Sequence, residues 1–228
     1  MCYTPVTLVR DREDWTEVGN SFGGAAYQVP CGKCPACLKR RRNDWSLRLY
    51  EELKVSDTAC FVTLTYEDPP LSFNGIPTLV KRDLQLWMKR LRKRNKTKIK
   101  YYAVGEYGTL SDRPHYHAIM FNVEQGNFQS YPSITKAWDK GHVHVGAVSR
   151  ASISYTTGYV MSGNWTPRCE LDDRQPHFSL MSKGLGKSYI ENPEIIRYHR
   201  ENLDQLYVTN RGNIKVAMPR YYRDKIFT

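Results

Sequence analysis

The sequence predicts an α+β fold in which helices flank a central antiparallel sheet. The predicted elements follow one another in the order helix, strand, helix, two strands, helix, strand and helix, which suits helices packed on an antiparallel sheet. The 228 residues, 40% of them hydrophobic and 25% charged, suit one globular domain. No internal repeat or clean boundary divides the chain. We therefore expect one domain over residues 1–228, with a cysteine-rich segment at 1–37 and a C-terminal extension at 164–228.

Each helix is predicted from apolar side chains at helical spacing. In the first helix, about residues 35–55, Leu38, Trp45, Leu49 and Leu53 form one stripe with arginines opposite. Further helices are expected at about 79–95, 131–140, 149–162 and 193–206, and strands at 60–66, 99–107, 115–123 and 141–148. The first 30 residues, with Gly19, Gly23 and Gly24, are expected to be irregular, as is most of the last 65, which ends in a basic, aromatic tail.

The central feature is the stretch at 99–123, IKYYAVGEYGTLSDRPHYHAIMFNV, which predicts two strands joined by a polar turn. Strand side chains alternate with period two, so His115 and His117 share a face, and Glu106 reaches it if the strands pair as a long hairpin. Two imidazoles and one carboxylate would make a partial divalent metal site, open to substrate and water. A His-x-His pair alone is more often an ordinary surface pair, so Glu106 matters to the prediction.

The charge of the chain predicts a nucleic-acid partner. The formal net charge is +11, and basic residues cluster at 39–42 and 89–100. Such runs are often solvated helix faces, but 16 Tyr and 5 Trp also offer surfaces on which unpaired bases could stack. Single-stranded DNA is the expected ligand. The candidate DNA-binding residues are Arg40, Arg41, Arg90, Arg94, Lys183 and Lys187.

The cysteines suggest a structural metal site. Cys31, Cys34 and Cys37 have C-x2-C-x2-C spacing, and Cys2 is the candidate fourth ligand for a tetrahedral Zn²⁺. Thiols without metal remain the alternative. A ferredoxin-type cluster is disfavoured because position 41, where its fourth Cys would fall, is Arg. With no recognisable signal peptide or membrane-spanning stretch, we expect a cytoplasmic protein without membrane contact, in which disulfides are rare.

Two tyrosines are candidate nucleophiles. Tyr155 and Tyr159 are spaced i and i+4, so a helix places both phenols on one face. Aromatic pairs at this spacing are common core packing, which is the simpler interpretation. A phenol, with a pKa of about 10, attacks phosphorus well only beside a metal ion and in basic surroundings. The basic metal site predicted upstream would supply both.

These motifs together resemble a known enzyme family. FVTLTY at 61–66, RPHYH at 113–117 and the Tyr155-x-x-x-Tyr159 pair resemble the three motifs of HUH endonucleases that start rolling-circle replication. The chain is most similar to replication initiation proteins of gokushoviruses, single-stranded DNA phages of the microvirus family. The resemblance extends to MC at 1–2, CGKC at 31–34 with Cys37, GEYG at 105–108, FSLMS at 178–182 and PRYY at 219–222.

The resemblance implies a sheet of about five antiparallel strands with the two histidines on a central strand. It implies Mg²⁺ or Mn²⁺ held by Glu106, His115 and His117, with Tyr155 and Tyr159 as the paired nucleophiles. The expected activity is sequence-specific nicking and joining of single-stranded DNA through a 5′-phosphotyrosine at a replication origin, a hairpin being one form of it. The host replication machinery would be a partner, and the site of action the cytoplasm of the infected bacterium.

Three departures from the family pattern leave alternatives open. Tyr116 stands where the family has an aliphatic residue. Gly158 stands where two-tyrosine members often carry Lys, so a basic residue must come from elsewhere, with Lys183 and Lys187 as candidates. His142 and His144 repeat the histidine pattern, but no well-placed Glu precedes them, so we favour His115 and His117. The alternative functions are a plasmid or transposon HUH nickase, and a zinc-stabilised DNA-binding regulator without activity.

Overall fold

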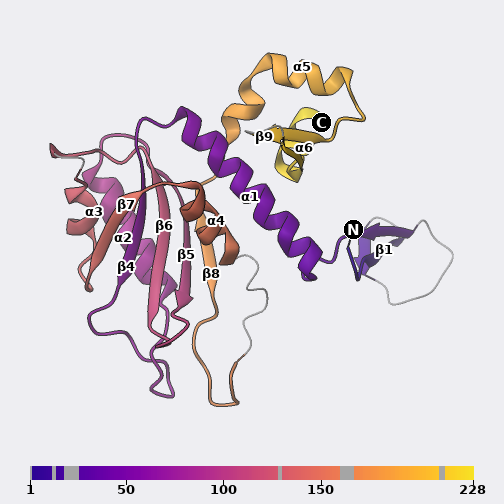
Figure 1. The fold of residues 1–228 in the computed structure, drawn as a ribbon. Helices are drawn as coiled ribbons and strands as arrows, with labels where there is room; N and C mark the ends of the chain where they lie inside the picture. The colour runs from indigo at the N-terminus through magenta and orange to yellow at the C-terminus, as the bar shows by residue number, and fades with distance from the viewer. Residues whose placement is uncertain (1, 12–13, 18–25, 128–129, 160–166, 211–213) are drawn as a thin grey trace.

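A five-stranded antiparallel sheet forms the centre of the computed structural model (Figure 1). The structure describes all residues except 1, 12–13, 18–25, 128–129, 160–166 and 211–213. The strand order β7-β4-β6-β5-β8 places β6 in the middle, which confirms the α+β fold and the central position of the two histidines. The strands are β4 (Ala59–Thr65), β5 (Lys100–Tyr107), β6 (Pro114–Phe121), β7 (Val143–Ala147) and β8 (Phe178–Met181).

Helices cover both faces of this sheet. On one face, α2 (Lys81–Arg94) contributes Leu84, Trp87, Met88 and Leu91 to the larger apolar core, beside α3 (Pro132–Ala137). On the other face, α1 (Pro35–Val55) and α4 (Arg150–Gly158) pack over a smaller core. Leu49 of α1 and Ile153 of α4 are both fully buried there. In Figure 1, α4 lies in front of the sheet and α2 behind it.

The predicted hairpin pairs over its whole length. Glu106 of β5 lies opposite His115 of β6, and Val104 lies opposite His117. On the other side of β6, Thr63 of β4 pairs with His117. Since side chains alternate along strands, Glu106, His115 and His117 all project from the face covered by α1 and α4. Glu106 therefore reaches the histidine face, as expected.

Tyr116, between the two histidines, points to the opposite face and is fully buried. Its hydroxyl lies 2.6 Å from the hydroxyl of Tyr66 and accepts a hydrogen bond of 3.0 Å from the backbone N–H of Val80. The Tyr66 hydroxyl in turn donates to Asp83 at 2.9 Å. The unusual residue in the histidine motif is thus an anchor that joins β6 to β4 and to the start of α2.

The N-terminal region forms a small sheet, so the expectation of an irregular segment was wrong. Strand β1 (Val6–Asp11) pairs antiparallel with β2 (Asp14–Glu17) on one side and with β3 (Ala26–Val29) on the other. The β-branched, apolar run at the start of β1 suits a strand, and its pairing with β3 folds the chain back on itself. The glycines at 19, 23 and 24 lie outside the described residues. In Figure 1 this sheet lies at the far end of α1 from the central sheet.

The C-terminal region also contains more regular structure than expected. Strand β8 was missed, and α5 ends at Glu201, earlier than predicted. A 3-10 helix, η3 (Lys187–Glu191), is followed by α5 (Pro193–Glu201), β9 (Tyr207–Asn210), β10 (Ile214–Ala217) and α6 (Arg220–Ile226). The basic, aromatic tail forms α6 because Tyr222 and Ile226, four residues apart, are buried against Leu47 of α1. Residues 160–162 of the helix predicted at 149–162 lie outside the described residues.

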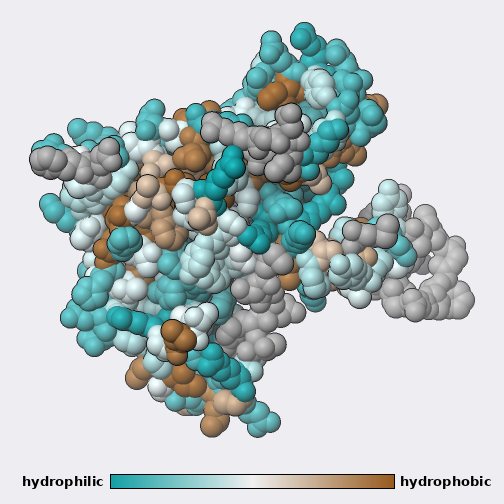
Figure 2. Space-filling view, in the orientation of Figure 1, coloured by the Kyte–Doolittle hydropathy of each residue, from teal (hydrophilic) through white to brown (hydrophobic). Residues whose placement is uncertain are grey.

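The surface is mostly hydrophilic, with apolar side chains gathered at the lower end of the molecule in Figure 2. The loop after β4 and the loop before β8 expose Leu71, Phe73 and Leu171. These two loops are joined because Asn74 hydrogen-bonds to the backbone carbonyl of Leu171 at 2.8 Å. Among the described residues, no helix combines the length and apolar character that a membrane span needs.

Candidate metal and nucleophile site

Glu106, His115 and His117 converge on one point of the sheet. The Nε2 atoms of His115 and His117 lie 2.7 and 3.0 Å from the same oxygen, Oε1 of Glu106. The candidate ligand atoms of the three residues all lie within 4.8 Å of one another. Strand pairing explains this convergence, because Glu106 lies directly opposite His115 and His117 is the next residue on that face. The three residues predicted as ligands are therefore brought together.

Each imidazole is held by its second nitrogen. Nδ1 of His117 lies 2.9 Å from the hydroxyl of Thr63, and Nδ1 of His115 lies 2.9 Å from the backbone carbonyl of Arg113. The His117 ring also stacks on Phe61, with ring centroids 5.2 Å apart. Outer partners of this kind orient histidine ligands and direct their free nitrogen toward a metal. Nothing in the sequence singled out Thr63 for this role, although it belongs to the FVTLTY motif.

The charges of this cluster are coupled. Burial acts to raise the pKa of Glu106, but hydrogen bonds from His115 and His117 outweigh it and lower the pKa below its usual range. Burial acts to lower the pKa of His115, while the bond to Glu106 outweighs it and raises the pKa. Glu106 is therefore a carboxylate at neutral pH, which is the state that binds a cation.

The donor set fits a divalent cation. Glu106 is 1% exposed, yet its second oxygen, Oε2, has no hydrogen-bond partner among the described residues. A buried carboxylate oxygen without a partner is costly, and a bound cation would remove that cost. Two imidazole nitrogens and carboxylate oxygen suit Mn²⁺ or Mg²⁺ with coordination positions left open. These three residues could hold such an ion.

The two tyrosines lie on α4, next to this cluster. The helix begins with a reciprocal Ser149–Ser152 capping box, and Thr157 joins it to α1 through a 2.9 Å hydrogen bond to Ser46. Tyr155, 48% exposed, donates a hydrogen bond of 3.2 Å to Oε1 of Glu106. The Tyr155 and Tyr159 rings are 5.1 Å apart. The spacing prediction is thus met, and both phenols lie on the side of α4 that faces the cluster.

The surroundings of the tyrosines disfavour their charged form. Burial, followed by the charge of Glu106, raises the pKa of Tyr155. Burial, with Tyr155 and Glu106 adding to it, also raises the pKa of Tyr159. Attack by either phenolate therefore requires nearby positive charge.

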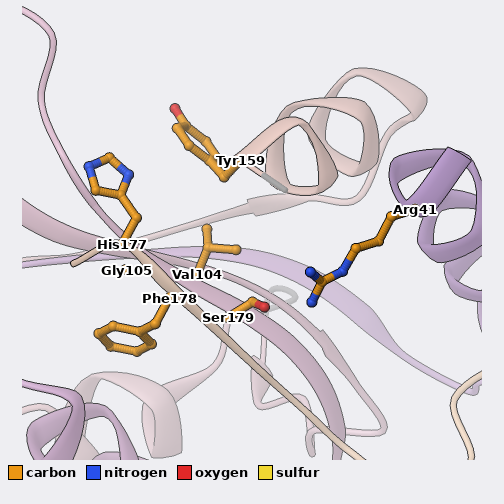
Figure 3. Close-up of a pocket in the computed structure, with 7 residues that line it drawn as sticks. All are labelled: Arg41, Val104, Gly105, Tyr159, His177, Phe178 and Ser179. Atoms are coloured by element: carbon orange, nitrogen blue, oxygen red, sulfur yellow. The ribbon is translucent and has the colours of Figure 1, made fainter. Parts of the chain in front are cut away.

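A pocket opens beside Tyr159, away from the metal cluster. It has a volume of about 230 Å³ and is lined by Arg41, Val104, Gly105, Tyr159, His177, Phe178 and Ser179. Figure 3 shows Arg41 reaching in from α1, His177 on the opposite side and Tyr159 above. Burial lowers the pKa of His177, and its Nδ1 is buried without a partner among the described residues. Sequence patterns had not indicated His177, which lies directly before β8, a strand that was itself missed.

The four cysteines form a second cluster, at the start of α1. The sulfur atoms of Cys2, Cys31, Cys34 and Cys37 lie within 4.8 Å of one another. Pairing of β1 with β3 folds Cys2 back toward the other three. The Thr4 hydroxyl, together with the backbone N–H groups of Lys33 and Cys34, lowers the pKa of Cys31 to about 5. Hydrogen bonds that favour a thiolate suit the four-sulfur site expected for Zn²⁺, although occupancy by zinc remains a prediction.

The predicted DNA-binding residues are spread over different surfaces. Arg41 lines the Tyr159 pocket, and Arg40 lines a groove beside the cysteine cluster. Arg90 pairs with Asp139 at 2.6 Å, and Arg94 is exposed near the end of α2, so both are on the opposite face of the sheet from the tyrosines. Lys187 pairs with Glu191 at 2.5 Å on η3, and Lys183 is exposed after β8. Only Arg41 is thus brought to the tyrosines.

His142 and His144 do not join the metal cluster. Both are exposed, and His144 pairs with Thr63, which lies between it and His117 in the sheet. The side chains of His144 and His117 therefore share a face but are separated by a whole strand. No carboxylate lies within ligand distance of His144 among the described residues. The preference for His115 and His117 agrees with this geometry.

Comparison with known proteins gives the family. A family model for replication-associated proteins of the ORF2 type matches residues 59–164. The replication-associated protein ORF2 of Spiroplasma virus 4 is 34% identical over 214 residues, covering 85% of this chain and 66% of the relative. The chain belongs to the phage replication-associated proteins. Replication-associated protein VP4 of Bdellovibrio phage phiMH2K is 29% identical over 221 residues, covering 88% of this chain and 68% of the relative.

A third member of this phage family is replication-associated protein ORF4 of Chlamydia phage 1, 27% identical over 223 residues, covering 87% of this chain and 53% of the relative. The chain thus spans between about half and two thirds of the length of these relatives. No solved structure matches the chain. The region that matches the family model contains Glu106, His115, His117, Tyr155 and Tyr159.

Proposed function

We propose that this chain is the replication initiator of a single-stranded DNA phage, which nicks and rejoins single-stranded DNA through a covalent 5′-phosphotyrosine. One observation carries the proposal: the Tyr155 hydroxyl lies 3.2 Å from the oxygen of Glu106 that both His115 and His117 approach. A nucleophile and three candidate metal ligands thus share one atom. Core packing alone would not require a half-exposed tyrosine to bond a buried carboxylate.

In the proposed reaction a tyrosine oxygen attacks the scissile phosphorus and the bond from phosphorus to the 3′ oxygen breaks. The products are a 5′-phosphotyrosine and a free 3′-OH, which the host polymerase extends. After one round, the second tyrosine attacks the regenerated junction, and the released 3′-OH attacks the first phosphotyrosine to close the circle. Two nucleophiles one helical turn apart can serve the same site in turn.

Residues of the chain prepare this chemistry. Thr63 and the Arg113 carbonyl orient the two imidazoles, and the bonds of α4 to α1 set the position of the tyrosines. Mg²⁺ or Mn²⁺ held by Glu106, His115 and His117 would polarise the phosphate and offset its charge. The cysteine cluster, with Zn²⁺ bound, would hold the N-terminal sheet against α1.

The partners and location follow from the proposed activity. The substrate would be single-stranded DNA at the replication origin, which a hairpin could present, and the host replication machinery would extend the new 3′ end. The protein would act in the cytoplasm of the infected bacterium. The phage origin of its relatives favours this function over a plasmid or transposon nickase.

The test is cleavage of 5′- and 3′-labelled oligonucleotides that tile the cognate circular genome, with Mn²⁺ or EDTA, on denaturing gels. Wild type should give a protein-linked 5′ end only with metal. His117→Ala should lose cleavage, whereas His144→Ala, a histidine on the same face outside the cluster, should keep it. Tyr155→Phe and Tyr159→Phe then assign the order of attack.

Two outcomes would oppose the proposal. Equal cleavage by His117→Ala and His144→Ala would exclude the assigned metal site. Intact oligonucleotides under every condition, with tight binding retained, would favour a zinc-stabilised DNA-binding regulator instead.

A further inference from the structure

Three consecutive arginines of α1 have three different surroundings. Arg40 lines a groove beside the cysteine cluster, together with Tyr3. Arg41 lines the pocket beside Tyr159, and Arg42 donates a hydrogen bond to the Ser154 hydroxyl of α4. Successive residues of an α-helix are about 100° apart around its axis, which explains the three directions. Arg41 is the arginine of this run that contributes to the Tyr159 pocket.

The pocket presents hydrogen-bond donors and positive charge. Arg41 is exposed and has no ion pair among the described residues. Ser179 adds a hydroxyl and His177 a buried, unpartnered Nδ1. Figure 3 shows the Arg41 guanidinium directed toward Ser179, with Tyr159 and His177 across the pocket. An unpaired guanidinium beside such groups favours an anionic ligand.

The size and walls of the pocket favour a phosphate over a base. Its volume of about 230 Å³ is below the range of about 300–1,000 Å³ typical of pockets that enclose a whole small-molecule ligand. The Phe178 ring is 6.2 Å from the Tyr116 ring and lies so close to Gly105 that a Cβ there would be 2.9 Å from it. That ring is committed to packing and is not free for a base to stack on.

Helix α4 lacks its own cation near Tyr159. Its last turn contains no basic residue, and the residue before Tyr159 is Gly158, with open space around it. Lys187, one of the two lysines predicted for this role, is paired with Glu191 on η3. Arg41, from the neighbouring helix, contributes instead to the pocket that Tyr159 borders.

We propose that Arg41, assisted by Ser179 and His177, binds a backbone phosphate of the DNA strand in this pocket, beside the phosphate that the tyrosines attack. The assignment rests on the proposed function, because it names the part of the DNA that the region around Tyr159 holds. It divides the site into a reacting position at the Glu106 cluster and a holding position at Arg41. The holding position keeps the strand in place at Tyr159.

The test is a binding cycle without metal, which separates it from cleavage. A fluorescent oligonucleotide, the tile that wild type binds most tightly in EDTA, is prepared with one neutral methylphosphonate at each position in turn. Affinity is measured by anisotropy for wild type, Arg41→Gln and the matched variant Arg40→Gln, which removes the same charge one residue away. Thermal melting checks that all three proteins are folded.

Arg41→Gln should weaken binding of the unmodified strand about tenfold, as should neutralising one particular phosphate in wild type. Combining the two should still cost about tenfold, because both changes remove the same contact. In Arg40→Gln, neutralising that phosphate should keep its full effect. The inference is overturned if Arg41→Gln binds like wild type, or if its effect multiplies with every methylphosphonate.

Failure of the proposed function has a different result. Wild type would then bind the oligonucleotide and show the Arg41 coupling, but would not cleave it with Mn²⁺. Cleavage by wild type without any coupling at Arg41 would retain the function and remove only the assignment of this pocket.

Discussion

Removal of the Tyr116 hydroxyl should destabilise the protein without altering the metal ligands on either side of it. Tyr116 is fully buried, and its hydroxyl contacts the Tyr66 hydroxyl at 2.6 Å and both the N–H and the C=O of Val80 at 3.0 Å. Tyr116→Phe removes three hydrogen bonds and leaves two backbone groups of Val80 without a partner. At about 1 kcal/mol for each bond, the expected loss is about 3 kcal/mol.

A second buried tyrosine provides the matched control. Tyr102, on the adjacent strand β5, is also fully buried, but its hydroxyl has no partner at hydrogen-bond geometry among the described residues, although Ser179 lies near. Tyr102→Phe removes the same atom without breaking a bond, so its stability should change by no more than about 0.5 kcal/mol. The difference between the two variants isolates the hydrogen-bond network from the loss of an oxygen atom.

Urea unfolding followed by tryptophan fluorescence measures both variants, because Trp87 and Trp138 lie in the same core as Tyr116. For a chain of this size, a loss of about 3 kcal/mol corresponds to a fall in Tm of roughly 6–12 °C. Mn²⁺ affinity should stay close to that of wild type in Tyr116→Phe below its melting range. A stability within about 1 kcal/mol of Tyr102→Phe would refute the role given to the Tyr116 network.

Three further predictions concern other parts of the chain. Protein prepared with Zn²⁺ should contain one zinc per chain by elemental analysis, and Cys31→Ser should lose it, while Cys169→Ser, at an exposed position outside the cluster, should retain it. Burial raises the pKa of Asp44 from 3.8 to about 6, so the folded state holds the proton more tightly and loses stability as pH rises through this interval. Asp44→Asn should therefore be more stable than wild type above pH 7, by at most about 3 kcal/mol in urea unfolding, and the advantage should vanish near pH 4. Gly141→Ala should lower Tm strongly, because φ is +145° and the new Cβ would be 2.3 Å from the backbone nitrogen of Glu67, whereas Gly158→Ala, in open space on α4, should raise it slightly. Equal zinc content, a pH-independent difference or similar melting of the two alanine variants would contradict the respective prediction.

Local periodicity explains which predictions succeeded. The period of two in 99–123 was sufficient to place His115 and His117 on one face, and long hairpin pairing places Glu106 opposite His115. The spacing of four in α4 was sufficient to place Tyr155 and Tyr159 together. Such patterns are properties of backbone geometry, which repeats every two or 3.6 residues whatever the surroundings.

The missed elements are short and stabilised by distant partners. Strand β8 has four residues and exists through pairing with β5, more than 70 residues earlier. Helix α6 depends on burial of Tyr222 beside Leu47 of α1. Strand β1 requires β2 and β3, which are also short. In each case tertiary contacts outweigh weak local preferences, and these contacts have no period in the sequence.

The sequence by itself determined the chemistry available to this protein: a carboxylate, two imidazoles and two phenols on regular elements, a four-cysteine cluster and a strongly basic chain. Only the tertiary structure decided which of these groups meet. It placed Tyr155 on Glu106, brought Arg41 to the Tyr159 pocket, and left Arg90 and Arg94 on the opposite face. The physical reason is that side-chain direction along one element is a local property, whereas packing of α1 and α4 on the sheet depends on apolar contacts between residues far apart in the chain.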